Sequence, residues 1–203
     1  MSTRPGPLEG ATRPPADVPA LEASVEGAHR PDPTKERPDL QHKAHAPRSV
    51  TFMVITVSDS RGPDNDRSGD VIHRLVAEAG HDVALYRVVK DDADAVERAV
   101  VEGLEHEAVQ IVVLNGGTGV SRRDGTCEVV ARMLDKRIDG FGEIFRALSY
   151  QQVGSAAMLS RAVGGICRGK AVFSMPGSPK AVELAMQSLI LPEAGHLIFE
   201  TRR

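Results

Sequence analysis

The sequence predicts an α/β fold in which a mainly parallel sheet carries helices on both faces. Three observations predict it. Apolar, strand-like runs alternate with amphipathic helical segments from Ser49 onward. Residues 111–114 are apolar without polar alternation, which is typical of a strand buried on both faces of a parallel sheet. The helical segments are long enough to connect parallel strands by right-handed crossovers.

The individual elements follow in a regular order. Four strands are expected, at residues 49–57, 81–89, 109–115 and 170–175. Helices are expected at residues 70–79, 92–106 and 140–152, with a further helix after Thr126 and a last one after Ser178. Gly80 ends the first helix, Thr126 and Ser178 are expected as N-caps, and Pro179 suits the first turn of its helix.

Composition limits the possible functions. With 203 residues, 41% of them hydrophobic and no long apolar run, the chain can form one globular domain with a proper core and no membrane span. A net charge of −3 and only seven aromatic residues argue against broad nucleic-acid binding. The two cysteines, Cys127 and Cys167, form no disulfide framework, which suits a cytoplasmic protein.

The N-terminal stretch differs from the rest of the chain. Residues 1–48 hold nine of the 13 prolines, among charges and few large apolar side chains. They predict a disordered tail without a secretory signal, ahead of a domain at residues 49–203. The tail histidines lack the paired spacing of a zinc site.

Polar clusters follow each expected strand. They are Ser58-Asp59-Ser60, Lys90-Asp91-Asp92, the stretch from Asn115 to Asp124, and Pro176-Gly177-Ser178. The ends of parallel strands lie at one edge of a sheet, so these loops should converge on one crevice. Glycines at 116, 117 and 119 would expose backbone N–H groups to an anion, although surface turns use glycine for conformational reasons too. The loop matches neither a P-loop nor a dinucleotide-binding fingerprint. Carboxylates beside a phosphate suggest an intervening divalent cation, and hence a magnesium nucleotide.

The motifs in these loops resemble a known family. The stretch Asn115-Gly-Gly-Thr-Gly-Val-Ser-Arg-Arg-Asp124 resembles a TGGTG motif followed by an Arg-Asp pair. Gly140-Phe-Gly-Glu143, Met158-Leu-Ser-Arg161 and Met175-Pro-Gly-Ser178 with Lys180 are similar to three further signatures. Together, in this order, they resemble the MoaB/MogA family of molybdenum cofactor biosynthesis, with details closer to the MoaB branch.

This resemblance implies a three-layer α/β/α molybdopterin-binding fold and an enzyme that adenylylates molybdopterin with Mg-ATP. It also implies a homotrimer or a hexamer that hands its product to the metal-insertion enzyme. Carboxylates matching Asp91 and Asp124 would act as catalytic, Mg²⁺-holding acids. The residues expected to bind substrate are Ser58, Asp59, Gly116, Gly117, Thr118, Gly119, Arg122, Glu143, Ser160, Arg161, Pro176, Gly177 and Ser178.

The chemistry agrees with these residue types. The attacking phosphate of molybdopterin is largely ionised at neutral pH, so the reaction needs no strong base. Catalysis would consist of positioning and charge neutralisation, with the glycine amides on phosphate oxygens and Arg122 or Arg123 on pyrophosphate.

Several alternatives remain open at this level. Asp91 could instead help to start the helix after it, one of the two arginines could be solvated, and Glu143 could belong to a subunit contact. Gly125 and Cys127 stand where relatives generally have an aliphatic residue and a proline, which would hold Asp124 less firmly. A molybdopterin-binding protein without turnover is therefore one alternative function. A scaffold that uses the N-terminal tail is another.

Overall fold

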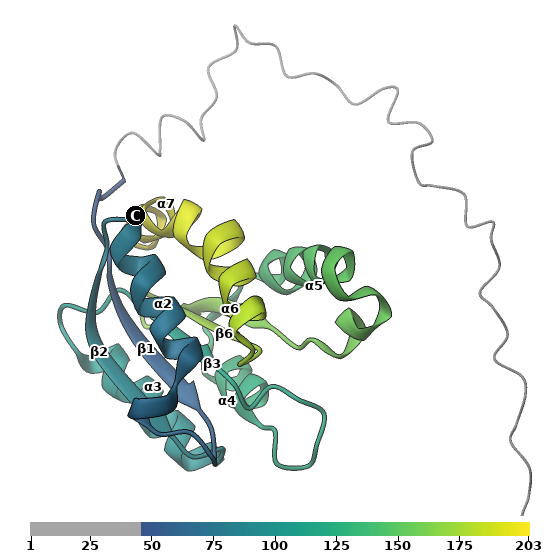
Figure 1. Cartoon of the computed structure of the whole chain (residues 1–203). Helices are drawn as coiled ribbons and strands as arrows, with labels where there is room; N and C mark the ends of the chain where they lie inside the picture. The colour runs from purple at the N-terminus through teal and green to yellow at the C-terminus, as the bar shows by residue number, and fades with distance from the viewer. Residues whose placement is uncertain (1–45) are drawn as a thin grey trace, which may run out of the picture. The chain divides into compact units, whose positions relative to one another are not determined.

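A computed structural model of the chain describes residues 46–203 and confirms the expected α/β fold (Figure 1). One six-stranded sheet has the order β2-β1-β3-β6-β5-β4. Strands β2, β1, β3 and β6 are parallel, whereas β5 and β4 run antiparallel to their neighbours. The strands are β1 (Thr51–Val57), β2 (Asp82–Val89), β3 (Ile111–Asn115), β4 (Lys136–Arg137), β5 (Val163–Cys167) and β6 (Lys170–Met175).

Helices cover both faces of the sheet and complete three layers. They are α2 (Arg67–Glu78), α3 (Ala93–Glu105), α4 (Thr126–Met133), α5 (Asp139–Val153), α6 (Pro179–Ala185) and α7 (Leu191–Thr201). Three short helical segments, η1 (Pro63–Asn65), η2 (Gly154–Leu159) and η3 (Met186–Ile190), connect them, and η3 is a π-helical stretch that joins α6 to α7. One buried apolar cluster joins the sheet to α2, α5, α6 and α7, and a second joins it to α3 and α4.

Strand β1 shows why this sheet is buried on both sides. Phe52 and Val54 belong to the first cluster, whereas Met53 and Ile55 belong to the second, and all four side chains are fully buried. Alternate residues of a strand point to opposite faces, so a strand between two helical layers is apolar along most of its length. The unbroken apolar runs in the sequence have this cause.

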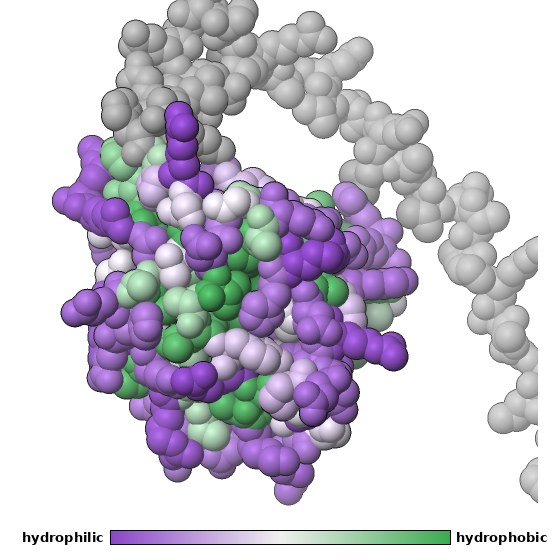
Figure 2. All heavy atoms as spheres, turned by 60° about the vertical axis from the view of Figure 1, so that its left-hand side comes forward, coloured by the Kyte–Doolittle hydropathy of each residue, from purple (hydrophilic) through white to green (hydrophobic). Residues whose placement is uncertain are grey.

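The outermost strand, β2, has a different pattern. Its side chains alternate between exposed and half-buried over most of its length. Figure 2 shows the side of the molecule that lies on the left in Figure 1, where a band of apolar surface is bordered by hydrophilic side chains. The charged residues Asp82 and Arg87 on this edge strand are of the kind that discourage pairing with another chain.

The structure differs from the sequence-based expectations in two places. Thr126 was expected as an N-cap, which is wrong: Gly125 holds the cap position without a side-chain hydrogen bond, and Thr126 is the first helical residue. The antiparallel pair of β4 and β5 was not expected, because β5 contains Gly164 and Gly165, which weaken the strand pattern. A Cβ atom on Gly165 would lie 2.2 Å from the carbonyl oxygen of Lys136, so this pairing requires glycine.

The predicted N-terminal tail lies almost wholly outside the described residues. Pro47 is described, and its carbonyl oxygen lies against α7, 2.6 Å from where a Cβ on Gly195 would be. Within residues 46–203, no helix is long and apolar enough to cross a membrane.

A core substitution tests this layered packing. Phe145 on α5 is fully buried and stacks on Phe141 at 6.4 Å between ring centroids. We expect Phe145→Ala to lower the free energy of unfolding by about 3–5 kcal/mol, because it removes buried apolar surface and leaves a cavity. Gln152→Ala, at an exposed position of the same helix, should change it by less than about 0.5 kcal/mol. Urea unfolding measures both, and equal losses would contradict the assignment of α5 to the core.

Candidate functional site

The four parallel strands end together, and their loops form one polar edge. Val57 of β1 pairs with Val89 of β2, and Asn115 of β3 pairs with Met175 of β6. Two further backbone bonds, Ser58 N–H to Val89 C=O at 2.9 Å and Gly116 N–H to Met175 C=O at 3.1 Å, continue the ladder into the loops. This register brings the four polar clusters to one edge, as the sequence predicted.

The loop after β3 passes between two carboxylates at close range. Gly116 and Gly117 have φ angles of +98° and +60°, which favour glycine. A Cβ on Gly117 would lie 2.8 Å from the Asp91 carboxylate, and one on Gly119 would lie 2.7 Å from the Asp124 carboxylate. Backbone conformation therefore favours glycine at Gly117, and a side chain at Gly117 or Gly119 would displace the carboxylate beside it.

Asp91 and Asp124 come from different connections, and the fold brings them together. Burial raises the pKa of Asp91, and the nearby charges of Asp124 and Asp59 raise it further. The pKa of Asp124 shifts in the opposite direction. Hydrogen bonds from Ser121 lower it, and the side-chain hydroxyl has a larger effect than the backbone N–H. Two interacting carboxyl groups of this kind favour one shared proton or a cation.

Asp91 does not cap α3, although the sequence left open that it helps to start this helix. The N-cap of α3 is Asp92, whose carboxylate accepts a 3.0 Å hydrogen bond from the Ala95 N–H. Asp91 instead lies beside the glycine loop, with its backbone N–H 3.3 Å from the Asp59 carboxylate.

The first loop is ordered by its own side chains. The Ser58 hydroxyl accepts hydrogen bonds from the N–H groups of Ser60 and Arg61, at 3.3 and 3.2 Å. Asp59 forms an ion pair with Arg123 at 2.9 Å, while Arg122 is exposed. Arg123 is thus already paired, and Arg122 is the freer cation of the two.

Arg161 holds the glycine loop from the other side. Its guanidinium donates to the carbonyl oxygens of Thr118 at 2.9 Å and Asp124 at 3.0 Å, and it pairs with the Glu128 carboxylate. Thr118 is buried under this contact. The sequence predicted Arg161 as a substrate ligand, and the structure assigns its guanidinium to the loop backbone.

The turn after β6 packs directly on the glycine loop. A Cβ on Gly177 would lie 2.9 Å from Cα of Gly116, so the two backbones touch. Ser178 caps α6 by accepting a 3.2 Å hydrogen bond from the Ala181 N–H, which confirms the predicted cap. The Gly177 carbonyl accepts hydrogen bonds from Arg61 and Ser68, two residues that the sequence analysis did not single out.

Ser160 and Glu143 line two hollows that share several residues. Ser160 and Arg161 line a hollow of about 430 Å³, and Glu143 lines one of about 150 Å³. Arg137 and Arg146 line both hollows, which also hold acidic side chains, and Arg137 pairs with Asp139 at 3.2 Å. Arg146 is therefore the basic side chain in these hollows that could meet an anionic ligand.

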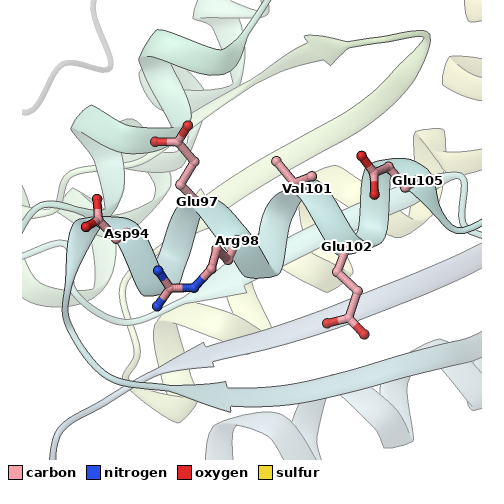
Figure 3. Close-up of a pocket in the computed structure, with 6 residues that line it drawn as sticks. All are labelled: Asp94, Glu97, Arg98, Val101, Glu102 and Glu105. Atoms are coloured by element: carbon pink, nitrogen blue, oxygen red, sulfur yellow. The ribbon is translucent and has the colours of Figure 1, made fainter.

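A separate hollow of about 490 Å³ lies on the outer face of α3 (Figure 3). Three of its four acidic side chains have basic partners: Glu97 pairs with Arg132, Glu102 with Arg87 and Glu105 with Arg168, at 3.6, 2.5 and 4.0 Å. Such an exposed, ion-paired face is typical of a solvated helix surface.

The two carboxylates suit magnesium, which needs few protein ligands, better than a metal that is enclosed wholly by protein ligands. Among residues 46–203, no group of three or more His, Cys, Asp or Glu side chains could hold a metal ion. Two carboxylates are the usual protein contribution to Mg²⁺, which takes its other ligands from water and substrate phosphates. Beside them, the hydroxyl of Thr126 is fully buried, faces Gly117 and has no hydrogen-bond partner among the described residues. The site therefore fits a phosphate ligand with its cation.

The chain resembles known proteins over most of its length. Residues 53–196 match the family described as "Probable molybdopterin binding domain". The chain is 52% identical over 164 residues to molybdenum cofactor biosynthesis protein B of Bacillus cereus, which covers 80% of this chain and 97% of the relative. It is 48% identical to the protein of the same name from Bacillus subtilis over a similar span, 80% and 96%.

Solved structures agree with this match. A crystal structure of a molybdenum cofactor biosynthesis protein B superimposes with a TM-score of 0.76 at 52% identity, covering 78% of this chain and 99% of that one. A tungsten cofactor synthesizing protein MoaB from Pyrococcus furiosus superimposes with a TM-score of 0.72 at 39% identity, covering 78% and 100%.

A glycine substitution tests the close approach of the loop to Asp91. We expect Gly117→Ala to destabilise the protein by about 1–3 kcal/mol, because its φ is positive and the new Cβ would collide with Thr126 and Asp91. Gly140→Ala is the matched control: that helical position has open space, so alanine should stabilise by about 0.5–1 kcal/mol. Thermal unfolding measures both. A neutral Gly117→Ala would contradict the described loop.

The raised pKa of Asp91 predicts a pH-dependent stability effect. The folded state holds its proton more tightly than the unfolded state, so ionisation destabilises the fold as pH rises above about 4. We expect Asp91→Asn to increase the melting temperature at pH 7, with a smaller increase at pH 4. Asp92→Asn should change little at either pH, since asparagine caps a helix as well as aspartate does. A loss of stability for Asp91→Asn at pH 7 would contradict the described environment.

Proposed function

The chain belongs to the MoaB/MogA family of molybdopterin-binding domains, and on this premise we propose that it adenylylates molybdopterin with Mg-ATP in molybdenum cofactor biosynthesis. The products are adenylyl-molybdopterin and pyrophosphate. The single observation that carries the proposal is the convergence of Asp91 and Asp124 on the glycine backbone between them.

The glycine loop supplies uncharged donors for phosphate oxygens. The Gly116 N–H is bonded to the Met175 carbonyl, so Gly117 and Gly119 are the donors offered: Gly117 is partly exposed, Gly119 is exposed, and their lack of a Cβ lets a phosphate approach the backbone closely. The Thr126 hydroxyl beneath Gly117 is a further donor without a partner among the described residues. The N-terminus of α4 adds partial positive charge at the same place.

Asp91 and Asp124 hold Mg²⁺ in this proposal, and both bind it as carboxylates. When bound, the ion neutralises charge on the nucleotide phosphates as the bond to the leaving pyrophosphate breaks. Ser121 keeps Asp124 ionised, whereas Asp91 must release any proton that it shares before the cation binds. The fixed backbone of the loop then aligns the molybdopterin phosphate with the α-phosphate of ATP.

Other predicted residues line the approach to this centre. Arg122 is placed to reach the pyrophosphate, because Arg123 is occupied by Asp59. The hollows that Ser160 and Glu143 line, with Arg146, suit the anionic groups of the second substrate. Arg161 acts by positioning the loop.

We further propose a cytoplasmic homotrimer or hexamer that passes its product to the metal-insertion enzyme. Large apolar side chains gather on α5 and η2, where Ile144, Tyr150, Val153, Met158 and Leu159 are more than half exposed. An apolar hollow of about 600 Å³ adjoins Ile144 and Phe141 and reaches α7. Exposed apolar surface of this kind is typical of subunit interfaces.

A molybdopterin-binding protein without turnover is the second candidate. Gly125 caps α4 without a side-chain hydrogen bond, so the helix start beside Asp124 is not rigidified by proline. Against this, Ser121 and Arg161 hold both the side chain and the carbonyl of Asp124. We therefore favour the enzyme.

The direct test is pyrophosphate release from Mg-ATP and molybdopterin. We expect wild type to release it, and Asp91→Asn and Asp124→Asn each to lower the rate by at least about 100-fold, because each removes a charged ligand at the reacting phosphates. Asp82 is the first residue of β2, so it lies at the end of the parallel strands away from the site, and Asp82→Asn should keep the wild-type rate.

The outcomes separate the candidates. Tight molybdopterin binding without pyrophosphate release would support the binder. A wild-type rate in Asp124→Asn would contradict the assignment of that acid. A protein lacking residues 1–48 should keep its activity, whereas a scaffold that uses the tail would lose its partner.

A further inference from the structure

Asp66 is a buried carboxylate that the proposed reaction does not use. It lies at the start of α2 and is fully buried. An ionised carboxylate is costly to bury unless its oxygens are hydrogen-bonded. One Asp66 oxygen accepts from the hydroxyls of Thr56 at 2.5 Å and Tyr86 at 2.8 Å, and the other accepts from Ser68 at 3.3 Å. Burial raises its pKa, but these bonds and one from the Gly69 backbone outweigh that effect and lower it, so Asp66 is ionised at neutral pH.

The first chain of hydrogen bonds leads from Asp66 to the glycine loop. An ionised carboxylate only accepts, so the single proton of Thr56 points to Asp66. The Thr56 oxygen must then accept from the Asn115 amide, at 2.8 Å. That amide also donates to the Ile55 carbonyl at 3.3 Å. Asn115 is the residue before Gly116, and its orientation is therefore set by the charge of Asp66.

The second chain leads to the turn after β6. The Ser68 hydroxyl lies 3.3 Å from the Asp66 carboxylate and 3.0 Å from the Gly177 carbonyl, and its single proton points to one of these two acceptors at a time. Arg61 donates to both Ser68 and Gly177, at 2.5 and 3.1 Å, and lies 4.0 Å from the Asp66 carboxylate. The two chains thus reach the two backbones that touch at Gly116 and Gly177.

We propose that Asp66 is a positioning residue that fixes the glycine loop and the turn at Gly177 relative to each other. Because it concerns the residues around the phosphate site, the inference rests on the proposed function. Asp66 is itself buried. It acts on the glycine loop through Thr56 and Asn115, and on the turn at Gly177 through Ser68 and Arg61. Without its charge, nothing sets the direction of the Thr56 hydroxyl, and the backbone donors of the loop lose their fixed placement.

Tyr86 supplies a matched control for this idea. It donates to the same carboxylate from β2 but leads to neither loop. Tyr86→Phe removes only a hydrogen bond to Asp66, whereas Ser68→Ala also removes contacts with Gly177 and Arg61. The deciding comparison is therefore Asp66→Asn with Tyr86→Phe, because only the first removes the charge that faces Ser68 and Arg61.

The test compares Asp66→Asn, Ser68→Ala and Tyr86→Phe in the full chain at a temperature where each is folded. Amide hydrogen exchange of residues 116–119 and 177 is measured without ligands, and pyrophosphate release is measured with Mg-ATP and molybdopterin. We expect exchange at these amides to speed up at least about tenfold in Asp66→Asn and Ser68→Ala, but less than about twofold in Tyr86→Phe. The kcat should fall at least about tenfold in the first two and stay within about twofold of wild type in the third.

Two results would overturn the proposal. One is exchange at these amides that is unchanged in Ser68→Ala and Asp66→Asn, and the other is loss of kcat that simply follows loss of stability across all three variants. If wild type releases no pyrophosphate, the proposed function fails, and the exchange measurement alone decides the role of Asp66. If Asp66→Asn does not fold, Ser68→Ala and Tyr86→Phe still give the comparison.

Discussion

The alignment of four parallel strand ends is the constraint on which the rest of the structure depends. Because β1, β2, β3 and β6 end in register, their loops share one edge, and like charges from two of these loops are forced together. A side chain at Gly117 or Gly119 would displace the carboxylate beside it. A crowded edge with carboxylates and bare amides is unfavourable for the protein alone and favourable once a cation and a phosphate bind.

The apolar core provides the stability of the fold, and the polar edge provides the candidate site. Two apolar clusters on either side of the sheet stabilise the fold, as the fully buried side chains of β1 show. The polar edge lowers the stability of the fold instead. The pKa of Asp91 is raised because its ionised form is less favourable in the folded state than in the unfolded state. The hydrogen bonds around Asp66 keep the segments of this edge in place, so that binding energy need not be used to order them.

Much of this arrangement could be predicted from the sequence, because it follows from local pattern. Apolar periodicity gave the four parallel strands, and the polar clusters after them gave Asp91, Asp124 and the glycines. The β5 strand was missed because Gly164 and Gly165 are required by packing against neighbours, which is a tertiary effect. The contacts of Asp66 with Thr56 and Tyr86, and those of Arg161 with the loop backbone, were not predicted, because these partners are separated in the sequence and no spacing rule connects them. Thr126 looked like a cap, but the backbone places Gly125 there.

The most direct test of the central claim is a crystal structure with ATP and Mn²⁺, which accepts the same oxygen ligands as Mg²⁺ and scatters anomalously. We expect an anomalous peak between the carboxylates of Asp91 and Asp124, with phosphate oxygens on the amides of the glycine loop. Bound nucleotide with the metal held elsewhere, and no peak between these two side chains, would contradict it.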